Sequence, residues 1–382
     1  MSAPFKAVVM GKGENTNLFR EVMYFNGLSK EDQLRVIDAL EGDPHTLNAL
    51  VNIGWAPESF SNLDSEVQKR LLVLAKDNEK LARRLNLGAA FARAGPDVKA
   101  LMIDCLNNDE LRAAFAFQLG LNSADLTDDA FDDASQLILS NERMTLMFAY
   151  GAGAASLTLQ ESVLQKLISL AESNHVFARN YGHSFVQSIR NSNSLDSPAK
   201  LSSVELILKN AKGELADAIC DEISKDPTAL PAIAAQLSGN DELVSKLALQ
   251  LSKNIKNYRG SKQEALIQSL ISNSSLALAF CSSAYGLGLN LIRELKDDKL
   301  ESLLRSSPAF AACLGAHTGK ELNGLNRKER RKIIEMAKRS PALASGLADG
   351  IKECKEVLSN DAKADIDQLA ARSEDFRRRL TS

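Results

Sequence analysis

The sequence predicts an all-α fold, an α-solenoid of about nine or ten HEAT- or tetratricopeptide-like helix-pair repeats with a cap at each end. Three observations predict it: an element that recurs about every 33 residues, amphipathic helical runs inside each copy, and polar capping residues between the runs. No alternation of apolar and polar residues is long enough to predict a convincing β-strand.

The repeats are expected to fill residues 26–358 as one elongated domain, after an N-terminal cap or arm at 1–25. Each copy holds an amphipathic run, a short polar break, and a Leu or Phe that is often followed by Ala. The tetratricopeptide and ankyrin signatures are not met, so the pattern indicates the general α-solenoid class and no particular family. The anchor positions are Leu47, Leu81, Leu111, Met144, Phe177, Leu215, Leu247, Leu276, Phe310 and Leu343.

The first helix of each repeat is expected to be short and amphipathic. Leu or Ile recurs every three or four residues in Glu66–Ala75, Val163–Ala171 and Arg330–Ala337. The polar break that follows supplies a side-chain cap for the second helix. The predicted caps are Asn78, Asn108, Asn141, Asn174, Asn273 and the pairs Ser307-Pro308 and Ser340-Pro341.

The second helix of each repeat is rich in alanine, as in Ala113–Ala116 and Ala277–Ala279. Small side chains let neighbouring helices approach closely, so the second helices are expected to form the tightly packed layer. A glycine often follows and is expected to end the helix in the left-handed conformation. These glycines are Gly54, Gly88, Gly120, Gly151, Gly182, Gly286, Gly315 and Gly350.

The C-terminal range 359–382 is expected to form a polar capping helix, because the end of a solenoid must face water. It carries Asp361, Asp365, Asp367 and Glu374, followed by the basic run Arg377–Arg379. That basic run could add to any basic patch nearby.

The overall composition is that of an ordinary globular chain. Of 382 residues, 45% are hydrophobic; 46 Lys and Arg face 49 Asp and Glu, a formal net charge of −3. This balance argues against a chain that binds nucleic acid or an anionic membrane along its whole length, although a local basic patch is compatible with it. The 5 cysteines show no CxxC spacing, and no signal peptide or membrane-length apolar run occurs. The sequence therefore predicts a soluble cytoplasmic protein with reduced thiols and no membrane partner.

No catalytic, metal or cofactor site is predicted. His175 and His183 lack the spacing and third ligand of a zinc site. Gly11–Gly13 and Tyr285–Leu289 contain glycine pairs without a complete phosphate-binding motif, and both are interpreted as local chain turns or helix ends. Asp128–Asp133 crowds four carboxylates without the EF-hand pattern, which favours a solvated acidic helix start over a cation site.

One basic stretch is a candidate site for an anionic partner, for instance the phosphate backbone of nucleic acid. Cations at the start of a helix oppose its dipole, and only three glutamates oppose eight cations here. The alternative is a solvated face that pairs with acidic residues of a neighbouring repeat, and the stretch has no aromatic residue for base stacking. The candidate patch consists of Lys320, Arg327, Lys328, Arg330, Arg331, Lys332, Lys338 and Arg339.

These features together predict a non-enzymatic scaffold that binds a protein or peptide along an extended solenoid surface. A nucleic-acid-binding or repair-associated protein that uses the basic patch is the alternative, and a self-assembling structural protein is a weaker one. No cofactor is expected. The nucleic-acid hypothesis gains support if the patch lines one strip together with cations of other repeats, and it loses support if the patch faces outward.

Overall fold

All regular secondary structure in the described part of the chain is helical, so the prediction of an all-α fold is confirmed there. The computed structural model describes residues 21–57, 60–192, 195, 197–283, 287–354 and 358–381. Residue contacts divide the chain into two units, Met1–Phe185 and Val186–Ser382, and each is described by itself. Most of the expected N-terminal arm at 1–25 lies outside the described residues.

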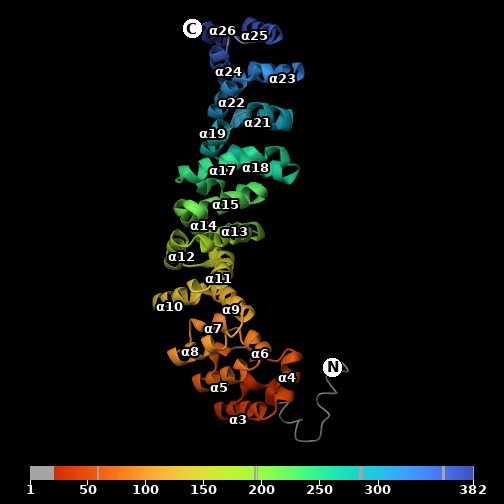
Figure 1. The fold of residues 1–382 in the computed structure, drawn as a ribbon. Helices are drawn as coiled ribbons and strands as arrows, with labels where there is room; N and C mark the ends of the chain where they lie inside the picture. Colours follow the sequence, from red (N-terminus) through yellow and green to blue (C-terminus); the bar gives the residue numbers. More distant parts are fainter. Residues whose placement is uncertain are drawn as a thin grey trace. The chain divides into compact units, whose positions relative to one another are not determined.

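The first unit holds a succession of short helices, which Figure 1 draws in red to yellow-green. Its α-helices are α3 (Lys30–Glu41), α4 (Pro44–Asn52), α5 (Ser65–Lys76), α6 (Glu79–Arg84), α7 (Leu87–Phe91), α8 (Pro96–Asp104), α9 (Asp109–Leu121), α10 (Asp128–Leu139), α11 (Glu142–Ala155), α12 (Glu161–Ser173) and the start of α13 (His175–Asn191). Single turns of 3₁₀ helix are η1 (Phe25–Gly27), η2 (Phe60–Asn62), η3 (Ser123–Asp125) and η4 (Ser156–Thr158).

The second unit continues the same pattern. Its α-helices are α14 (Pro198–Asn210), α15 (Gly213–Lys225), α16 (Leu230–Ile233), α17 (Asp241–Asn254), α18 (Ser261–Ser272), α19 (Ser274–Ser282), α20 (Leu287–Glu294), α21 (Asp297–Ser306), α22 (Pro308–Lys320), α23 (Arg327–Arg339), α24 (Pro341–Cys354), α25 (Asn360–Arg372) and α26 (Glu374–Thr381). Its 3₁₀ turns are η5 (Pro227–Ala229), η6 (Ala234–Leu237), η7 (Ile255–Asn257) and η8 (Leu322–Gly324). The range 359–382, expected to be one helix, thus contains two, with Ser373 capping the second.

The helix starts follow from the capping residues. Every cap predicted from the sequence accepts a hydrogen bond from the backbone N–H three residues later, in the manner of a helix N-cap. The Oδ1 atom of Asn108 accepts from the N–H of Leu111 at 2.9 Å, and Oγ of Ser307 accepts from that of Phe310 at 3.2 Å. These bonds satisfy backbone donors that would otherwise lack a partner inside the helix.

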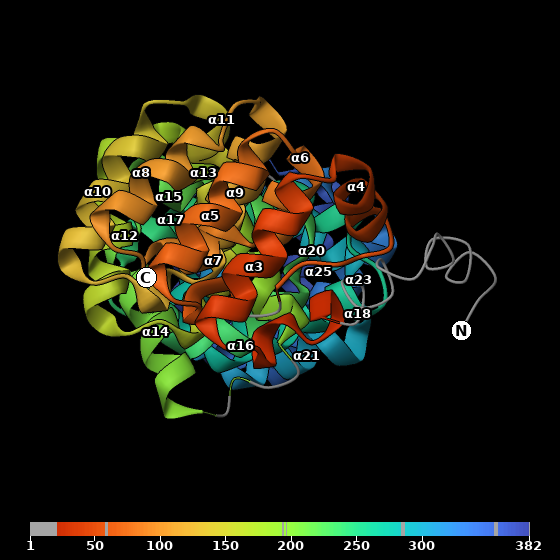
Figure 2. The same cartoon turned by 90° about the horizontal axis from the view of Figure 1, so that it is seen from below.

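Within each unit, a helix packs mainly against the helix two or three places further along the chain, as in helical-repeat proteins. In the first unit α7, α9 and α11 follow one another in this way, and so do α3, α5 and α8 (Figures 1 and 2). In the second unit the series is α15, α17, α19, α22 and α24, beside α16, α18 and α21. We call α3, α5, α8, α10, α12, α18, α21, α23 and α25 the first-helix row of their unit, and α7, α9, α11, α15, α17, α19, α22 and α24 the second-helix row.

Glycines determine how closely the second-helix rows pack, and the helix-ending role predicted for them is wrong for most. Of the predicted glycines that the structure describes, only Gly54 has a positive φ, at 105°, whereas Gly88, Gly120, Gly151, Gly315 and Gly350 lie inside helices. A methyl group on Gly151 would overlap the carbonyl oxygen of Phe117 and lie 2.8 Å from the nitrogen of Leu121. The missing Cβ therefore lets two helix backbones touch. Gly182 also lies inside a helix, α13, and Gly286 is outside the described residues.

Ion pairs join successive members of the first-helix rows. A cation on one helix reaches a carboxylate on a neighbouring helix about one repeat away in sequence. In the first unit the Nζ–O distances are 2.8 Å for Lys30–Glu66, 2.7 Å for Lys69–Asp97 and 2.7 Å for Lys166–Asp128. In the second unit the pairs include Lys299–Glu264 at 2.7 Å, Lys332–Asp297 at 2.8 Å and Arg330–Asp365 at 2.8 Å. Acidic and basic side chains, which are nearly equal in number in the chain, therefore pair with each other between neighbouring repeats.

No single helix among the described residues is both long and apolar enough to cross a membrane. The helices α18 and α19 reach that length and composition only when taken together, and the chain bends by 112° between them.

Candidate interaction surface

The basic candidate patch is centred on α23, and the start of this helix is fully capped despite its cations. The side chain of Asn326 accepts from the N–H groups of Lys328 at 2.9 Å and Glu329 at 3.0 Å. In return, the Glu329 carboxylate accepts from the Asn326 N–H at 2.8 Å, which completes a capping box. The Glu329 carboxylate also offsets the unfavourable placement of cations beside the helix dipole.

Five of the eight cations have partners within the second unit. Arg330 is only 6% exposed; its Nε lies 2.8 Å from Asp365, and its Nη1 donates to the Leu325 carbonyl at 2.7 Å. Lys332 donates to two backbone carbonyls of the α20 segment and pairs with Asp297. The other partnered cations are Lys320 with Glu353 at 2.6 Å, Lys338 with Glu335, and Arg339 with Glu301 at 2.6 Å.

Three cations of the patch are left exposed. Arg327, Lys328 and Arg331 lie in the first two turns of α23, and none of them has an ion-pair or hydrogen-bond partner through its side chain among the described residues. The eight cations therefore do not form one continuous basic strip. Arg330, Lys332 and Arg339 join α23 to α25 and α21. Lys320 joins α22 to α24, Lys338 pairs within α23, and the remaining three cations face solvent.

An open groove of about 790 Å³ runs beside these free cations, between α20, α21 and α23. Lys328 and Arg331 line it from α23, while Asp297 and Glu301 line it from α21. Ile292 and Met336 form an apolar floor, since both side chains are almost fully buried. Five cations and four carboxylates line the groove, so its charge is nearly neutral: Arg293, Lys328, Arg331, Lys332 and Arg339 against Asp297, Glu301, Glu329 and Glu335.

Arg293 lines the groove and holds Glu329 in place. Its Nε lies 2.9 Å from the Glu329 carboxylate, and its guanidinium also donates to the carbonyl of Gly324 at 3.0 Å. The hydrogen bond from Arg293 lowers the pKa of Glu329, and the backbone N–H of Asn326 lowers it further. Glu329 is therefore held ionised, and its negative charge is balanced by Arg293 and by the start of α23.

A second groove, of about 560 Å³, lies between α10 and α12 in the first unit. It contains part of the acidic stretch Asp128–Asp133. Lys166 pairs with Asp128 at 2.7 Å and lies 5.4 Å from the centre of the Phe131 ring, while Lys99 of α8 lies 3.7 Å from Asp133. Asp128, Asp132 and Asp133 thus face cations of neighbouring helices. No three His, Cys, Asp or Glu side chains of the described residues converge as a metal site.

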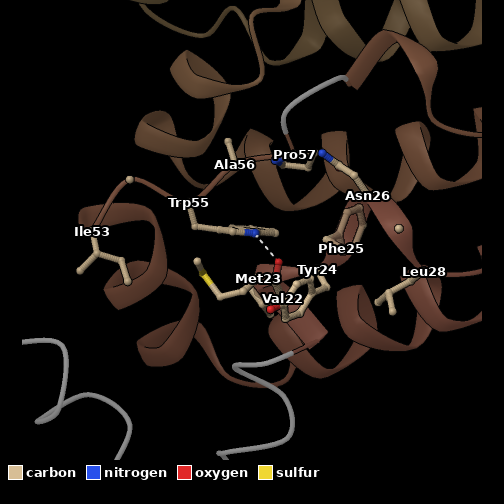
Figure 3. Close-up of a pocket in the computed structure, with 12 residues that line it drawn as sticks. Val22, Met23, Tyr24, Phe25, Asn26, Leu28, Ile53, Trp55, Ala56 and Pro57 are labelled. Carbon is tan, nitrogen blue, oxygen red and sulfur yellow. Dashed lines mark hydrogen bonds between the residues drawn. The ribbon is translucent and has the colours of Figure 1, made fainter. Parts of the chain in front are cut away.

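An aromatic pocket of about 580 Å³ lies near the start of the described chain, and it was not among the sites predicted from the sequence. Figure 3 shows the Trp55 indole, which donates to the Val22 carbonyl at 3.0 Å. The ring of Phe25 meets the indole edge to face at 6.0 Å, and Tyr24 beside it is 67% exposed. The one tryptophan of the chain was the available signal for this pocket.

The remaining sequence candidates do not gather into a site. His45 lies on α4, His175 and His183 on α13, and His317 on α22 beside Cys313. The glycine pair at 11–13 lies outside the described residues, as do residues 285 and 286 of the second pair. Comparison with protein-family models, curated proteins and solved structures finds no match for this chain.

Proposed function

We propose that this chain is a non-enzymatic interaction scaffold and that the groove between α20, α21 and α23 binds an acidic segment of a partner protein. The observation that carries the proposal is the pair of free cations, Lys328 and Arg331, in a groove that also has carboxylates and an apolar floor. Acidic side chains of a partner would pair with the two cations, and its apolar side chains would cover the floor.

The near-neutral groove favours a protein over nucleic acid as partner. Affinity for a phosphate backbone grows with the number of phosphates that cations neutralise, and of the eight patch cations only Arg327, Lys328 and Arg331 are free to do so. The carboxylates Asp297, Glu301 and Glu335 of the same groove would repel a uniformly anionic polymer. Nucleic-acid binding through the three free cations is the second candidate function.

We also propose that both units are built from HEAT- or tetratricopeptide-like helix pairs of about 33 residues, as parts of an α-solenoid with about nine or ten repeats. Polar contacts between neighbouring first helices support this period, because they join residues 28 to 38 positions apart, such as Lys69 with Asp97 and Arg339 with Glu301. Such repeats add binding surface unit by unit.

The test of the scaffold function compares native complexes of three forms of the full chain. They are the wild type, a variant that combines Arg327→Glu, Lys328→Glu and Arg331→Glu, and a charge-matched control that combines Lys209→Glu, Lys212→Glu and Lys253→Glu on exposed positions of other segments. We expect protein partners that survive nuclease treatment and are lost from the groove variant, while the control retains them. Loss of every partner on nuclease treatment would overturn the scaffold proposal.

A direct titration separates the two candidate functions. The purified chain is added to a fluorescent DNA duplex and, separately, to a fluorescent peptide that alternates Glu with Leu, at two salt concentrations. We expect duplex binding no tighter than ordinary non-specific binding, with Kd of about 10⁻⁶ M or weaker at physiological salt. Tight, steeply salt-dependent duplex binding that the groove variant abolishes would establish the nucleic-acid function instead. Elution of the chain as a large homopolymer would favour self-assembly.

A further inference from the structure

Two cysteines on neighbouring helices of the second unit form a thiol pair. Cys281 lies near the end of α19, Cys313 lies in α22, and these two helices pack against each other. The Cys281 thiol lies next to that of Cys313, and the hydroxyl oxygen of Ser282, the residue after Cys281, lies 3.6 Å from the Cys313 sulfur. Cys281 is buried, with 1% of its surface exposed, whereas Cys313 is only half-buried. One residue of the pair is therefore partly exposed, and the other is buried beside it.

Polar groups surround Cys313 and favour its ionised form. The hydroxyl oxygen of Ser282 lies 3.6 Å from its sulfur, and His317, one turn further along α22, hydrogen-bonds to it. The hydrogen bond from Cys281, together with Ser282 and His317, lowers the pKa of Cys313 to about 6 against the opposing effect of burial. The same thiol–thiol hydrogen bond and burial raise the pKa of Cys281. The pair thus consists of one thiolate and one neutral thiol that donates to it.

We propose that Cys281 and Cys313 are a peroxide-sensitive dithiol that closes reversibly into a disulfide between α19 and α22. Its co-reactant is a small hydroperoxide such as hydrogen peroxide.

Two steps account for every atom and electron. The Cys313 thiolate attacks one peroxide oxygen, the O–O bond breaks, and hydroxide leaves, so that Cys313 becomes a sulfenic acid. The Cys281 sulfur then attacks the Cys313 sulfur; the S–S bond forms, the S–OH bond breaks, and the hydroxyl leaves as water with the Cys281 proton. The two sulfurs lose two electrons in total and the peroxide gains them. A small dithiol reverses the change by thiol–disulfide exchange.

The other cysteines provide internal controls. Burial raises the pKa of Cys105 to about 11 and that of Cys220 to about 12, which leaves both as unreactive neutral thiols. Cys354 is half-buried like Cys313 but has no thiol partner among the described residues. A thiolate with a second thiol behind it therefore occurs only at Cys313 within the described residues.

The first experiment needs no substitution. The native full chain is treated with hydrogen peroxide, the remaining thiols are blocked, and peptides are mapped by mass spectrometry without reductant. We expect one linked pair of peptides, through Cys281 and Cys313, which has lost two hydrogen atoms and separates again with dithiothreitol. Oxidation that yields no such link, or links through Cys354 instead, would overturn the proposal.

The second experiment tests the order of steps. In Cys281→Ala, dimedone is expected to trap a sulfenic acid on Cys313, because no resolving thiol is present; the matched control Cys354→Ser should still form the disulfide. The alkylation rate of Cys313 in the folded wild type should rise through an inflection near pH 6, against about 8.5 for the chain unfolded in urea. An inflection near pH 8.5 in the folded chain, or dimedone labelling of Cys354 rather than Cys313, would contradict the proposed attack by the Cys313 thiolate.

Discussion

The two rows of helices in the second unit are held together by different interactions. In the second-helix row, α22 and α24 meet backbone to backbone at two glycines on each helix, Gly315 and Gly319 against Gly346 and Gly350. In the first-helix row, α21, α23 and α25 are joined by charged side chains, with Arg330 reaching Asp365 and others reaching α21. The helices α22 and α24 of the second-helix row thus meet where side chains are missing, whereas α21, α23 and α25 of the first-helix row are joined by long charged side chains.

The contrast shows where the fold tolerates sequence change. A backbone contact has no room for one methyl group, since packed interiors give way very little. An exposed ion pair between flexible side chains adds little to stability and can be lost without rebuilding the interface. The first-helix row is therefore the part of each repeat that is free to vary for binding, and the second-helix row is the part that must be kept.

The largest effect is expected from Gly346→Ala. The new methyl group would overlap the carbonyl oxygen of Ala312 and lie 2.7 Å from its carbon, so α22 and α24 must separate. Typical overpacking costs about 1–3 kcal/mol, and this backbone clash should exceed about 3 kcal/mol in urea unfolding followed by circular dichroism. The control Gly42→Ala meets nothing closer than 3.7 Å and should be neutral. Equal stability of the two variants would refute the close contact.

The part of the second-helix row without glycine should respond to the opposite change. Leu247 is fully buried on α17, and α17 packs against α15 and α19 without a close glycine contact. Leu247→Ala should lower the free energy of unfolding by about 3 kcal/mol through the cavity it leaves. The control is Leu278→Ala at an exposed position of α19. If Leu247→Ala lowers the free energy of unfolding by less than this control does, then side chains do not fill the interface around α17.

In the first-helix row, Arg330→Met should have the strongest effect because Arg330 is buried. The variant removes the ion pair with Asp365 and the bond to the Leu325 carbonyl, at a cost of about 2 kcal/mol. Adding Asp365→Leu should restore part of this loss, since no unpaired carboxylate is then left behind. If the double variant is less stable than the single one in the same unfolding assay, the pairing with Asp365 is not the source of the effect.

Glu329→Gln should cost about 1 kcal/mol at pH 7, because it weakens both the capping box and the pair with Arg293. The pKa of Glu329 is lowered in the folded chain, so its contribution is complete above the ordinary glutamate value of 4.5 and is lost as the pH falls through the folded value. The gap between the urea midpoints of wild type and variant should therefore narrow below pH 4.5. If the difference between the two urea midpoints widens below pH 4.5, Glu329 does not stabilise the fold through its ionised form.

The smallest effect is expected at an exposed pair, Lys69 with Asp97, in the first unit. Asp97 is 80% exposed and Lys69 is 38% exposed, so Lys69→Gln should change the unfolding midpoint less than any of the variants above. The variant should instead raise the pKa of Asp97 toward 3.8, because the hydrogen bond from Lys69 is what lowers it. Carboxyl NMR titration measures this shift, and an unchanged Asp97 would mean that the pair does not form in solution.

The spacing of the repeat contained more information about the candidate sites than the local motifs did. Cys281 and Cys313 are about one repeat apart, and so are Gly315 and Gly346, which is why each pair meets on neighbouring helices. A search for short cysteine motifs finds nothing, because the two cysteines are adjacent only after the repeats stack. The groove beside α23 was not predictable, since it depends on which cations the neighbouring helices neutralise.

The sequence by itself determined the helices and their starts, because amphipathic periodicity and caps such as Asn108 and Ser307 act within a few residues of the chain. Only the tertiary structure decided the role of the glycines and of the basic patch. Glycine is suited both to a helix end and to a backbone contact, and a cation is suited both to a ligand and to a neighbouring carboxylate. The group that determines each role, a backbone atom for the glycine or a carboxylate for the cation, lies about one repeat away on another helix.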